Sequence, residues 1–376
     1  MSNNNDSTKI HETEDRNVSF DILKIICTFL IVFHHYQQMI GSFEFPVKFS
    51  EGKFYFGYVV DLFFIISGYL MFKYQDRIRN QKTSFKDFYL KRILRLLPMS
   101  TLSVIGFLIV TILCKVLSGD YHSGLHPSLM GAIFASGGIQ SWGIVPNPWI
   151  NSPLWYVGVL LVCYFLFYVI NKFVKGKYIF WTYTALIIVG LIVLTKDLNA
   201  AFLNHDMARG FIGFFVGLIL AGISNRIPLD NWKAFLISSL VFIGCVLGFL
   251  FGTHITRFGT GWIPYDIAAL AIVIYPSLLI LLAFKPLKKI FNVFGKPAGF
   301  AAGVSFEVYL WHSPMIILFN LLHSQYFQMI NIRCAKIMLL FSLLLFAYCV
   351  VVYLLIEKTL VKKITEKIFK DLSEVR

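Results

Sequence analysis

Charged residues are scarce in this chain: they make up only 14% of its 376 residues, whereas 57% are apolar. Its mean hydropathy is +0.70. A soluble domain could not keep so much apolar surface away from water, so lipid must cover part of it. A bilayer core about 30 Å thick needs roughly 20 apolar residues per helix. The sequence therefore predicts an all-α, polytopic membrane protein and excludes a sizeable soluble domain.

Closely spaced cysteines and an N-terminal apolar segment are also absent. The six cysteines show no CxxC spacing and fall in or beside apolar runs, so neither a disulfide nor a metal site is predicted. Residues 1–19 are polar and lack the apolar stretch of a cleaved signal peptide. They are expected to form a disordered cytoplasmic tail.

Ten apolar runs have the length of a membrane-spanning helix. They are predicted at residues 20–40, 54–72, 97–117, 154–170, 179–195, 207–222, 234–251, 264–283, 302–322 and 335–356. We therefore expect one transmembrane domain over residues 20–357. A short basic cytoplasmic tail is expected at residues 358–376.

Lys and Arg are nearly absent from every second loop. With the N-terminus placed in the cytoplasm, the cytoplasmic segments carry 25 of these residues and the outer loops carry 5. An excess of this kind on one side follows the positive-inside rule. It predicts an even number of spans, both termini in the cytoplasm, and a multi-pass protein of the cytoplasmic membrane. The net charge of +14 is thereby explained by topology and lipid contact, and no nucleic-acid partner is expected.

The outer loop at residues 118–153 carries no Lys or Arg and is rich in Gly, Pro and Trp. Pro146, Pro148 and Trp149 stand near its end. Irregular backbone at membrane depth is tolerated only where protein or water satisfies its polar groups. The loop is therefore expected to fold back as a partly buried, re-entrant cap.

Ionisable side chains inside apolar spans are costly, so each is a functional candidate. Lys24 and His35 are eleven residues apart, about three helical turns, and share one helix face. His34 is rotated about 100° from His35. Asp61 belongs to the second span, which runs inward from about residue 54, and is expected at a depth similar to that of His35. An Asp61–His35 pair is expected, in which the carboxylate orients the imidazole as a general base.

Three further ionisable groups lie in or at later spans. Arg209, at the outer start of the sixth span, could complete an outer polar pocket. His312 is expected near the middle of the membrane, and Glu307 nearer the cytoplasm. Each of these groups also has a purely structural interpretation, because an aspartate can cap a helix and a buried histidine can bind a backbone carbonyl. Both interpretations remain open.

Arg92 and Arg95 lie at positions i and i+3 of a basic helix next to the membrane. Two guanidinium groups placed in this way form a good fork for a phosphate. A similar basic patch more often reflects only the positive-inside rule or contact with anionic lipids.

Five motifs occur in a characteristic order: FDILKIICTFLIVFHH, VDLFFIISGYLMF, FYLKRILRLLP, NSPLWYVGVLLVCY and VSFEVYLWHSPM. In this order the chain resembles acyltransferase family 3, a family of membrane acyltransferases, over nearly all of residues 18–357. The resemblance implies ten membrane helices and no permanently bound cofactor. It also implies transfer of an acyl group, usually acetyl, from acyl-CoA to a cell-surface glycan.

The resemblance assigns roles to four residues. The family's first motif, a basic residue followed eleven positions later by a histidine, corresponds to Lys24 and His35. The family's Arg-x-x-Arg pair corresponds to Arg92 and Arg95, which implies that these residues hold the phosphates of CoA. After SPLW many members carry acidic residues, whereas here two leucines follow Val159. A catalytic acid at that place is therefore excluded.

The resulting hypothesis is a route across the membrane for the acyl group of acetyl-CoA, the expected donor. Its acceptor is a hydroxyl of a surface glycan or a lipid-linked glycan. From inside to outside the route follows Arg92 and Arg95, Lys24 and Glu307, His312, and finally His35, Asp61 and Arg209. His35 either deprotonates the acceptor hydroxyl or accepts the acyl group transiently.

Two other classes stay open. The first is a ten-helix transporter or flippase of a lipid-linked glycan, although the chain shows no internal inverted repeat. The second is a noncatalytic subunit of an envelope-synthesis complex. Membrane lipids are expected partners in every case, and no oligomeric state is predicted.

Overall fold

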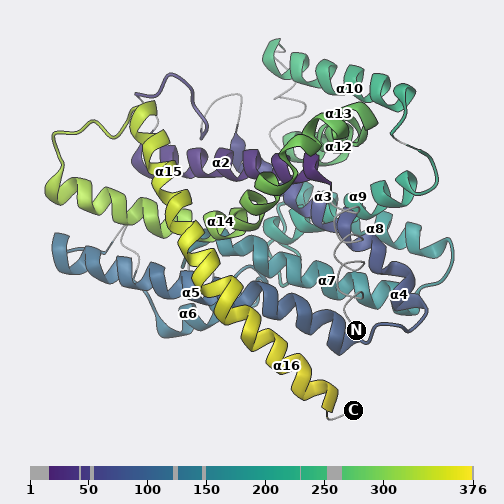
Figure 1. Cartoon of the computed structure of the whole chain (residues 1–376), viewed down its shortest axis with the longest axis horizontal. Helices are drawn as coiled ribbons and strands as arrows, with labels where there is room; N and C mark the ends of the chain where they lie inside the picture. Colours follow the sequence, from purple (N-terminus) through teal and green to yellow (C-terminus); the bar gives the residue numbers. More distant parts are fainter. Residues whose placement is uncertain are drawn as a thin grey trace, which may run out of the picture.

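The computed structural model describes residues 17–41, 44–50, 55–121, 126–145, 150–228, 230–251 and 265–374. In these residues the regular elements are helices, apart from an isolated bridge between Ala200 and Leu203. Most long helices run along the longest axis of the molecule (Figure 1). Helices α15 (Ala335–Val352) and α16 (Lys362–Glu374) cross the others as one continuous rod (Figure 1).

Eight helical segments of the described chain are long and apolar enough to cross a membrane. They contain α2 (Val18–Ile40); η1 (Phe56–Val59), α3 (Val60–Met71), η2 (Phe72–Tyr74) and α4 (Gln75–Arg79); α5 (Phe85–Ser118); η4 (Ser152–Leu154) and α7 (Trp155–Phe173); α8 (Tyr178–Lys196); α9 (His205–Ser224); α13 (Lys285–Phe291), η7 (Asn292–Phe294) and α14 (Gly295–Tyr326); and α15, the π-helix η8 (Tyr353–Val361) and part of α16. The protein is therefore an all-α, polytopic membrane protein.

Two shorter apolar helical stretches coincide with the predicted spans at 234–251 and 264–283. The first is α10 (Trp232–Phe251). The second consists of α11 (Tyr265–Ala269), the π-helix η6 (Leu270–Ile274) and α12 (Tyr275–Ala283). The apolar parts of these stretches, Trp232–Gly248 and Ile267–Ala283, are each only 10–17 residues long. A total of ten spans and the side on which the termini lie therefore remain predictions.

Helix α5 begins twelve residues before the predicted span at 97–117. Ser84 caps it, because its hydroxyl oxygen accepts a hydrogen bond from the backbone N–H of Asp87. The basic segment that follows is rich in Leu, Lys and Arg, which favour helix, and Pro98 lies within the helix without ending it. Arg92 and Arg95 are thus held on a rigid helix that continues into the membrane region.

Both expected tails are partly helical. Residues 18 and 19 belong to α2, and residues 1–16 lie outside the described part of the chain. At the other end, residues 358–374 form the last part of η8 and all of α16, which continue the rod that begins with α15. The Phe369 ring of α16 lies 5.4 Å from Nζ of Lys91, so this segment packs against α5.

The loop at residues 118–153 is partly buried, as its composition predicts. It contains the short helix α6 (Leu129–Ser136), which packs against α5. Trp142 Nε1 donates a 3.1 Å hydrogen bond to the carbonyl oxygen of Gly158 on α7, and Ile150 and Asn151 are buried. Pro146, Pro148 and Trp149 lie outside the described residues.

Glycines bring α3 and α9 into backbone contact. A Cβ atom at Gly68 would collide with the carbonyl oxygen of Phe214, and one at Gly217 would collide with that of Ile65. A Cβ at Gly213 would lie 3.1 Å from the carbonyl oxygen of Asp61. Small residues allow this close approach of helices in a membrane protein. The contact determines which side chain of α9 meets Asp61.

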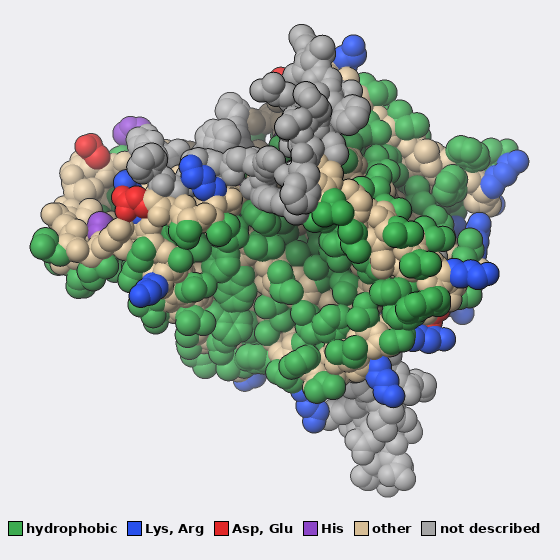
Figure 2. Space-filling model, turned by 90° about the horizontal axis from the view of Figure 1, so that it is seen from above, with side chains coloured by type: hydrophobic (Ala, Val, Ile, Leu, Met, Phe, Trp, Pro, Cys, Tyr) green, Lys and Arg blue, Asp and Glu red, His purple; other side chains and the backbone are tan. Residues whose placement is uncertain are grey.

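The surface agrees with a membrane location. Figure 2 shows a broad apolar surface across the middle of one face, with most of the visible Lys and Arg side chains toward one end. At the opposite end, acidic, basic and histidine side chains lie among polar ones (Figure 2). Large apolar side chains of α5 and α15 are exposed, including Ile109, Ile112, Leu343 and Leu344. Lipid is the environment that such side chains require.

Candidate active site

Helices α2 and α14 run side by side in the same direction and carry most of the candidate residues. A Cβ atom at Gly295, the first residue of α14, would lie 3.9 Å from Val18, the first residue of α2. Farther along, the rings of His35 and His312 lie 5.0 Å apart, and those of Tyr36 and Phe319 lie 6.1 Å apart. The two helices therefore order the groups between them from their first residues to their last.

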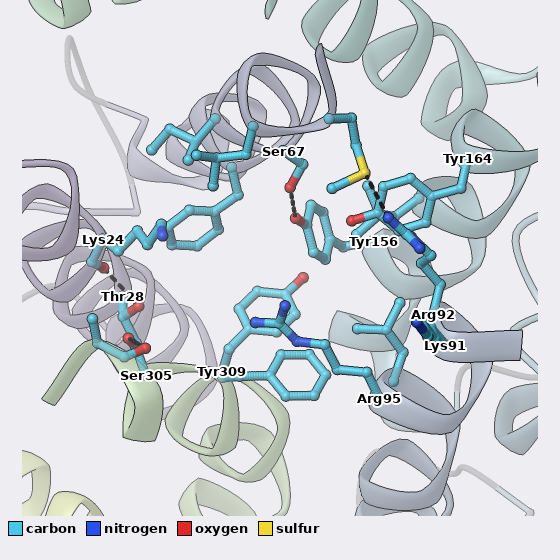
Figure 3. Close-up of a pocket in the computed structure, with 18 of the residues that line it drawn as sticks. Lys24, Thr28, Ser67, Lys91, Arg92, Arg95, Tyr156, Tyr164, Ser305 and Tyr309 are labelled. Atoms are coloured by element: carbon cyan, nitrogen blue, oxygen red, sulfur yellow. Dashed lines mark hydrogen bonds between the residues drawn. The ribbon is translucent and has the colours of Figure 1, made fainter. Parts of the chain in front are cut away.

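A cavity of about 320 Å³ lies near the beginning of these helices, between α2, α3, α5, α7 and α14 (Figure 3). We call it the basic pocket, because four cationic side chains line it. They are Lys24, Lys91, Arg92 and Arg95. Among the described residues, no Asp or Glu is part of its lining. Leu160, the first of the two leucines that follow Val159, forms part of its apolar wall. The pocket is suited to a polyanion such as a phosphate ester.

Arg92 and Arg95 differ in what their guanidinium groups contact. Arg92 is buried: Nη1 donates a 2.8 Å hydrogen bond to the carbonyl oxygen of Phe88, and its Cζ lies 3.8 Å from the Phe88 ring centre. Nη2 lies 3.4 Å from Sδ of Met71. Arg95 is exposed and extends toward Tyr309 in Figure 3. The expected two-arginine fork is therefore only partly available, and Arg95 offers the more accessible donors.

Lys24 lines the same pocket from α2 and lies 3.6 Å from Asp21 Oδ1 through its Nζ atom. The carbonyl oxygen of Lys24 accepts a 2.8 Å hydrogen bond from the Thr28 hydroxyl. The structure thus places Lys24 opposite α5, on the same cavity as the two arginines.

The histidine pair, His35 and His312, lies farther along α2 and α14. Nδ1 of His35 lies 2.9 Å from Oε1 of Gln38, and Nδ1 of His312 lies 3.3 Å from the carbonyl oxygen of Val308. Because these oxygens only accept, both Nδ1 atoms carry the proton, and each neutral ring has its lone pair on Nε2. Nε2 of His312 is buried and has no hydrogen-bond partner in the described chain. The pair therefore presents two basic nitrogens.

Asp61 pairs with Arg209 and not with His35, which corrects the expected Asp61–His35 pair. Asp61 Oδ1 accepts a 2.8 Å hydrogen bond from Nε of Arg209, and Nη2 of Arg209 donates to the carbonyl oxygen of Gly57 at 3.0 Å. Arg209 also lies 4.6 Å from the Trp155 ring centre. Since the glycine contact presses α9 against α3, Arg209 reaches Asp61 first. Gln38 takes the orienting place at His35 instead.

Glu307 is remote from the route that the sequence suggested. It is fully buried, does not line the basic pocket, and interacts with Glu357 of η8 and with Trp311. In a helix, residues 307 and 312 lie on different faces because five positions correspond to about 500°. Glu307 therefore faces α15 and η8, whereas His312 faces α2.

His34 binds a loop. Its Nδ1 atom lies 3.0 Å from the carbonyl oxygen of Phe49, its ring lies 4.6 Å from that of Tyr55, and it is 1% exposed. It therefore has the structural role that the sequence left open for buried histidines.

Tyr309 joins the basic pocket to the histidine pair. It lines the pocket, its ring lies 5.8 Å from that of His312, and its hydroxyl donates a 2.7 Å hydrogen bond to the carbonyl oxygen of Pro153. Asn151, which is fully buried and lies two residues before Pro153, donates hydrogen bonds to the Ser103 hydroxyl and to the carbonyl oxygen of Leu310. Sequence reasoning missed both residues. The only signal was their place in the NSPLW and YLWHSPM motifs, since neither carries a charge.

Comparison with known proteins agrees with the family resemblance that the sequence motifs indicate. Residues 17–358 match the model of a family described as an acyltransferase domain. The chain is also similar to the O-acetyltransferase OatA of Staphylococcus aureus strains NCTC 8325 and COL, with 27% identity over 308 residues in each case. These matches cover 71% of this chain and 47% of each relative, so the chain spans about half the length of these curated relatives. No solved structure matches the chain.

Proposed function

The chain belongs to the acyltransferase domain family, and from that membership we propose that it is a membrane O-acyltransferase. It transfers an acyl group, acetyl by analogy with the similar O-acetyltransferases, from cytoplasmic acyl-CoA to a hydroxyl of an extracytoplasmic glycan or glycan precursor. One observation supports this function most strongly. The basic pocket and the histidine pair lie along the same two parallel helices, joined by Tyr309.

The basic pocket is the proposed donor site. The phosphates of CoA bind Arg95 and Lys91, with Lys24 on the opposite wall. Arg92 supports the site by linking α5, where it binds the Phe88 carbonyl oxygen, to Met71 of α3. Lys24 and His35 are separated along α2 by roughly 16 Å. The pantetheine arm of CoA, a long flexible chain between the phosphates and the thioester, suits such a separation.

The histidine pair is the proposed site of transfer. The acceptor hydroxyl gives its proton to Nε2 of His35 while its oxygen attacks the thioester carbonyl. The acyl C–O bond forms, the C–S bond breaks, and CoA leaves as the thiol with that proton. A transient acyl group on the same nitrogen is the covalent form of this mechanism.

The function is tested with purified protein in detergent and acetyl-CoA, by following the appearance of free CoA thiol. With no glycan present, water takes the place of the acceptor hydroxyl, so acetate and CoA are the products. We expect release by the wild type and none above background by His35→Ala. A transporter or a noncatalytic subunit would release no CoA, and that result would overturn the proposal. Mass spectrometry of protein quenched after incubation with acetyl-CoA alone separates the two forms, because only the covalent one leaves acetyl on the peptide containing His35.

In cells, mass spectrometry of surface glycans with and without the gene tests the acceptor. The proposal requires that glycan acetyl groups disappear when the gene is deleted and return when it is restored.

A further inference from the structure

A second cavity, of about 340 Å³, lies where α2 and α14 end. We call it the distal pocket. Its polar lining residues are Glu44, Asn320, His323, Gln328, Asn331 and Arg333. Ile40, the last residue of α2, forms part of its wall.

The distal pocket lies on the opposite side of the histidine pair from the basic pocket. Ile40 is five residues beyond His35 on α2, about 7.5 Å along the helix axis. Asn320 is eight residues beyond His312 on α14, about 12 Å along the axis. Because the two helices are parallel, basic pocket, histidine pair and distal pocket follow one another along the same line.

The charges of the distal pocket are already paired. Glu44 Oε2 accepts a 2.8 Å hydrogen bond from Asn331, and Glu44 Oε1 lies 3.7 Å from Nη1 of Arg333. Arg333 Nε donates a 3.1 Å hydrogen bond to the carbonyl oxygen of Ile40, which ties the segment before α15 to the end of α2. The pocket therefore has an ordered polar frame without the excess of cations that distinguishes the basic pocket.

We propose that the distal pocket binds the acceptor of the reaction, and that the unit it holds is an uncharged sugar. Amide, carboxylate and guanidinium groups supply both donors and acceptors, which is the set that several neighbouring hydroxyls require. An anionic sugar would call for unpaired cations, whereas Arg333 is engaged by Glu44. One sugar hydroxyl then points along α2 and α14 to the histidine pair. This inference rests on the proposed acyltransferase function.

The test compares Asn320→Ala and Gln328→Ala with Ser324→Ala. Ser324 lies near both residues, but its hydroxyl binds the carbonyl oxygen of Leu321 and does not line the pocket. Each variant is measured twice: for CoA release from acetyl-CoA by the purified protein, and for glycan acetylation in cells lacking the native gene. The double variant Asn320→Ala/Gln328→Ala should lower glycan acetylation about tenfold or more, because contacts to the sugar are lost. Hydrolysis of acetyl-CoA in the absence of glycan uses no contact to the sugar, so CoA release in that assay should be unchanged, and Ser324→Ala should resemble the wild type.

Each other outcome is decisive. Normal glycan acetylation by the double variant overturns the role of the distal pocket as the acceptor site and leaves the proposed function intact. Loss of CoA release together with acetylation overturns the acceptor role, because the substitutions then act on the donor reaction or on folding. If the wild type itself fails to acetylate the glycan, the proposed function and this inference both fall. Fragmentation of the acetylated glycan locates the acetyl group, and a location only on anionic sugars overturns the assignment of an uncharged unit.

Discussion

The hydrogen bond between His35 and Gln38 acts at the scale of a single residue. It places the proton on Nδ1 and leaves Nε2 of His35 as the base. His35→Ala should lower the transfer rate by a factor of about 10² to 10⁴, the usual effect of removing a general base. Gln38→Ala should cause a smaller loss, while Gln38→Glu, which keeps an acceptor oxygen, should recover most of the activity. The measurement is the initial rate of acetyl transfer at saturating acetyl-CoA.

Two results would contradict this interpretation of His35. A well-expressed His35→Ala protein with normal transfer would remove His35 from the mechanism, and Gln38→Glu no better than Gln38→Ala would remove the orienting bond. His34→Ala is not a neutral control, because His34 holds the loop at Phe49.

The two arginines of the basic pocket allow a second prediction at the same scale. Arg95→Ala should weaken acetyl-CoA binding by roughly 1.5 to 3 kcal/mol, the value of a charge-assisted hydrogen bond. Arg92→Ala should instead lower thermal stability in detergent, since it leaves Phe88 and Met71 without their partner. Lys82, exposed and outside the pocket, provides the control. Equal small losses of binding for all three alanine variants would indicate a nonspecific basic patch.

The α3–α9 contact belongs to the scale of helices. Gly217→Ala should destabilise the protein by about 1 to 3 kcal/mol, the usual effect of overpacking, because its Cβ would meet the Ile65 carbonyl oxygen. Gly244→Ala on α10 is the matched control, since nothing lies within 4 Å of its Cβ position. Thermal unfolding of both variants in the same detergent provides the comparison, and a stable Gly217→Ala protein would argue against the tight contact.

The same contact buries the Asp61–Arg209 pair. Asp61→Asn removes one charge of a buried pair and should cost about 3 to 5 kcal/mol, because Arg209 is then left uncompensated. The double variant Asp61→Asn/Arg209→Met should be more stable than Asp61→Asn alone. If the double variant is the least stable of the three, the cost does not arise from the unpaired arginine. A purely catalytic role for Asp61 would leave the unfolding temperature unchanged.

At the scale of the whole molecule, the order of basic pocket, histidine pair and distal pocket requires a defined orientation in the membrane. A cysteine at Met329, which is 99% exposed, should react in intact cells with a membrane-impermeant thiol reagent. A cysteine at Lys82 should not, because the asymmetry of Lys and Arg places that segment inside. Cys334→Ser is included in both variants, since Cys334 is partly exposed near Met329. Labelling of the cysteine at position 82 and not of the one at position 329 would show that the protein has the opposite orientation in the membrane.

Sequence alone determined the class of protein and the residues worth examining. Long apolar runs specify membrane helices because lipid leaves a backbone no other hydrogen-bond partners. The motifs around His35, His312 and Arg95 identified the family. In the structure the two histidine rings lie 5.0 Å apart, and Arg95 lines the basic pocket near the beginning of the same two helices. These features are local or periodic, and a sequence displays them directly.

Only the tertiary structure decided which ionisable groups meet. Helical periodicity gives the face of a residue on its own helix, but not the rotation of one helix against another. The close approach of α3 and α9 therefore paired Asp61 with Arg209, and the packing of α14 turned Glu307 away from the basic pocket. Gln38 and Tyr309 carry no charge, so burial in the membrane gave no reason to select them from the sequence. Their roles arise from hydrogen bonds and ring contacts that exist only once the helices pack.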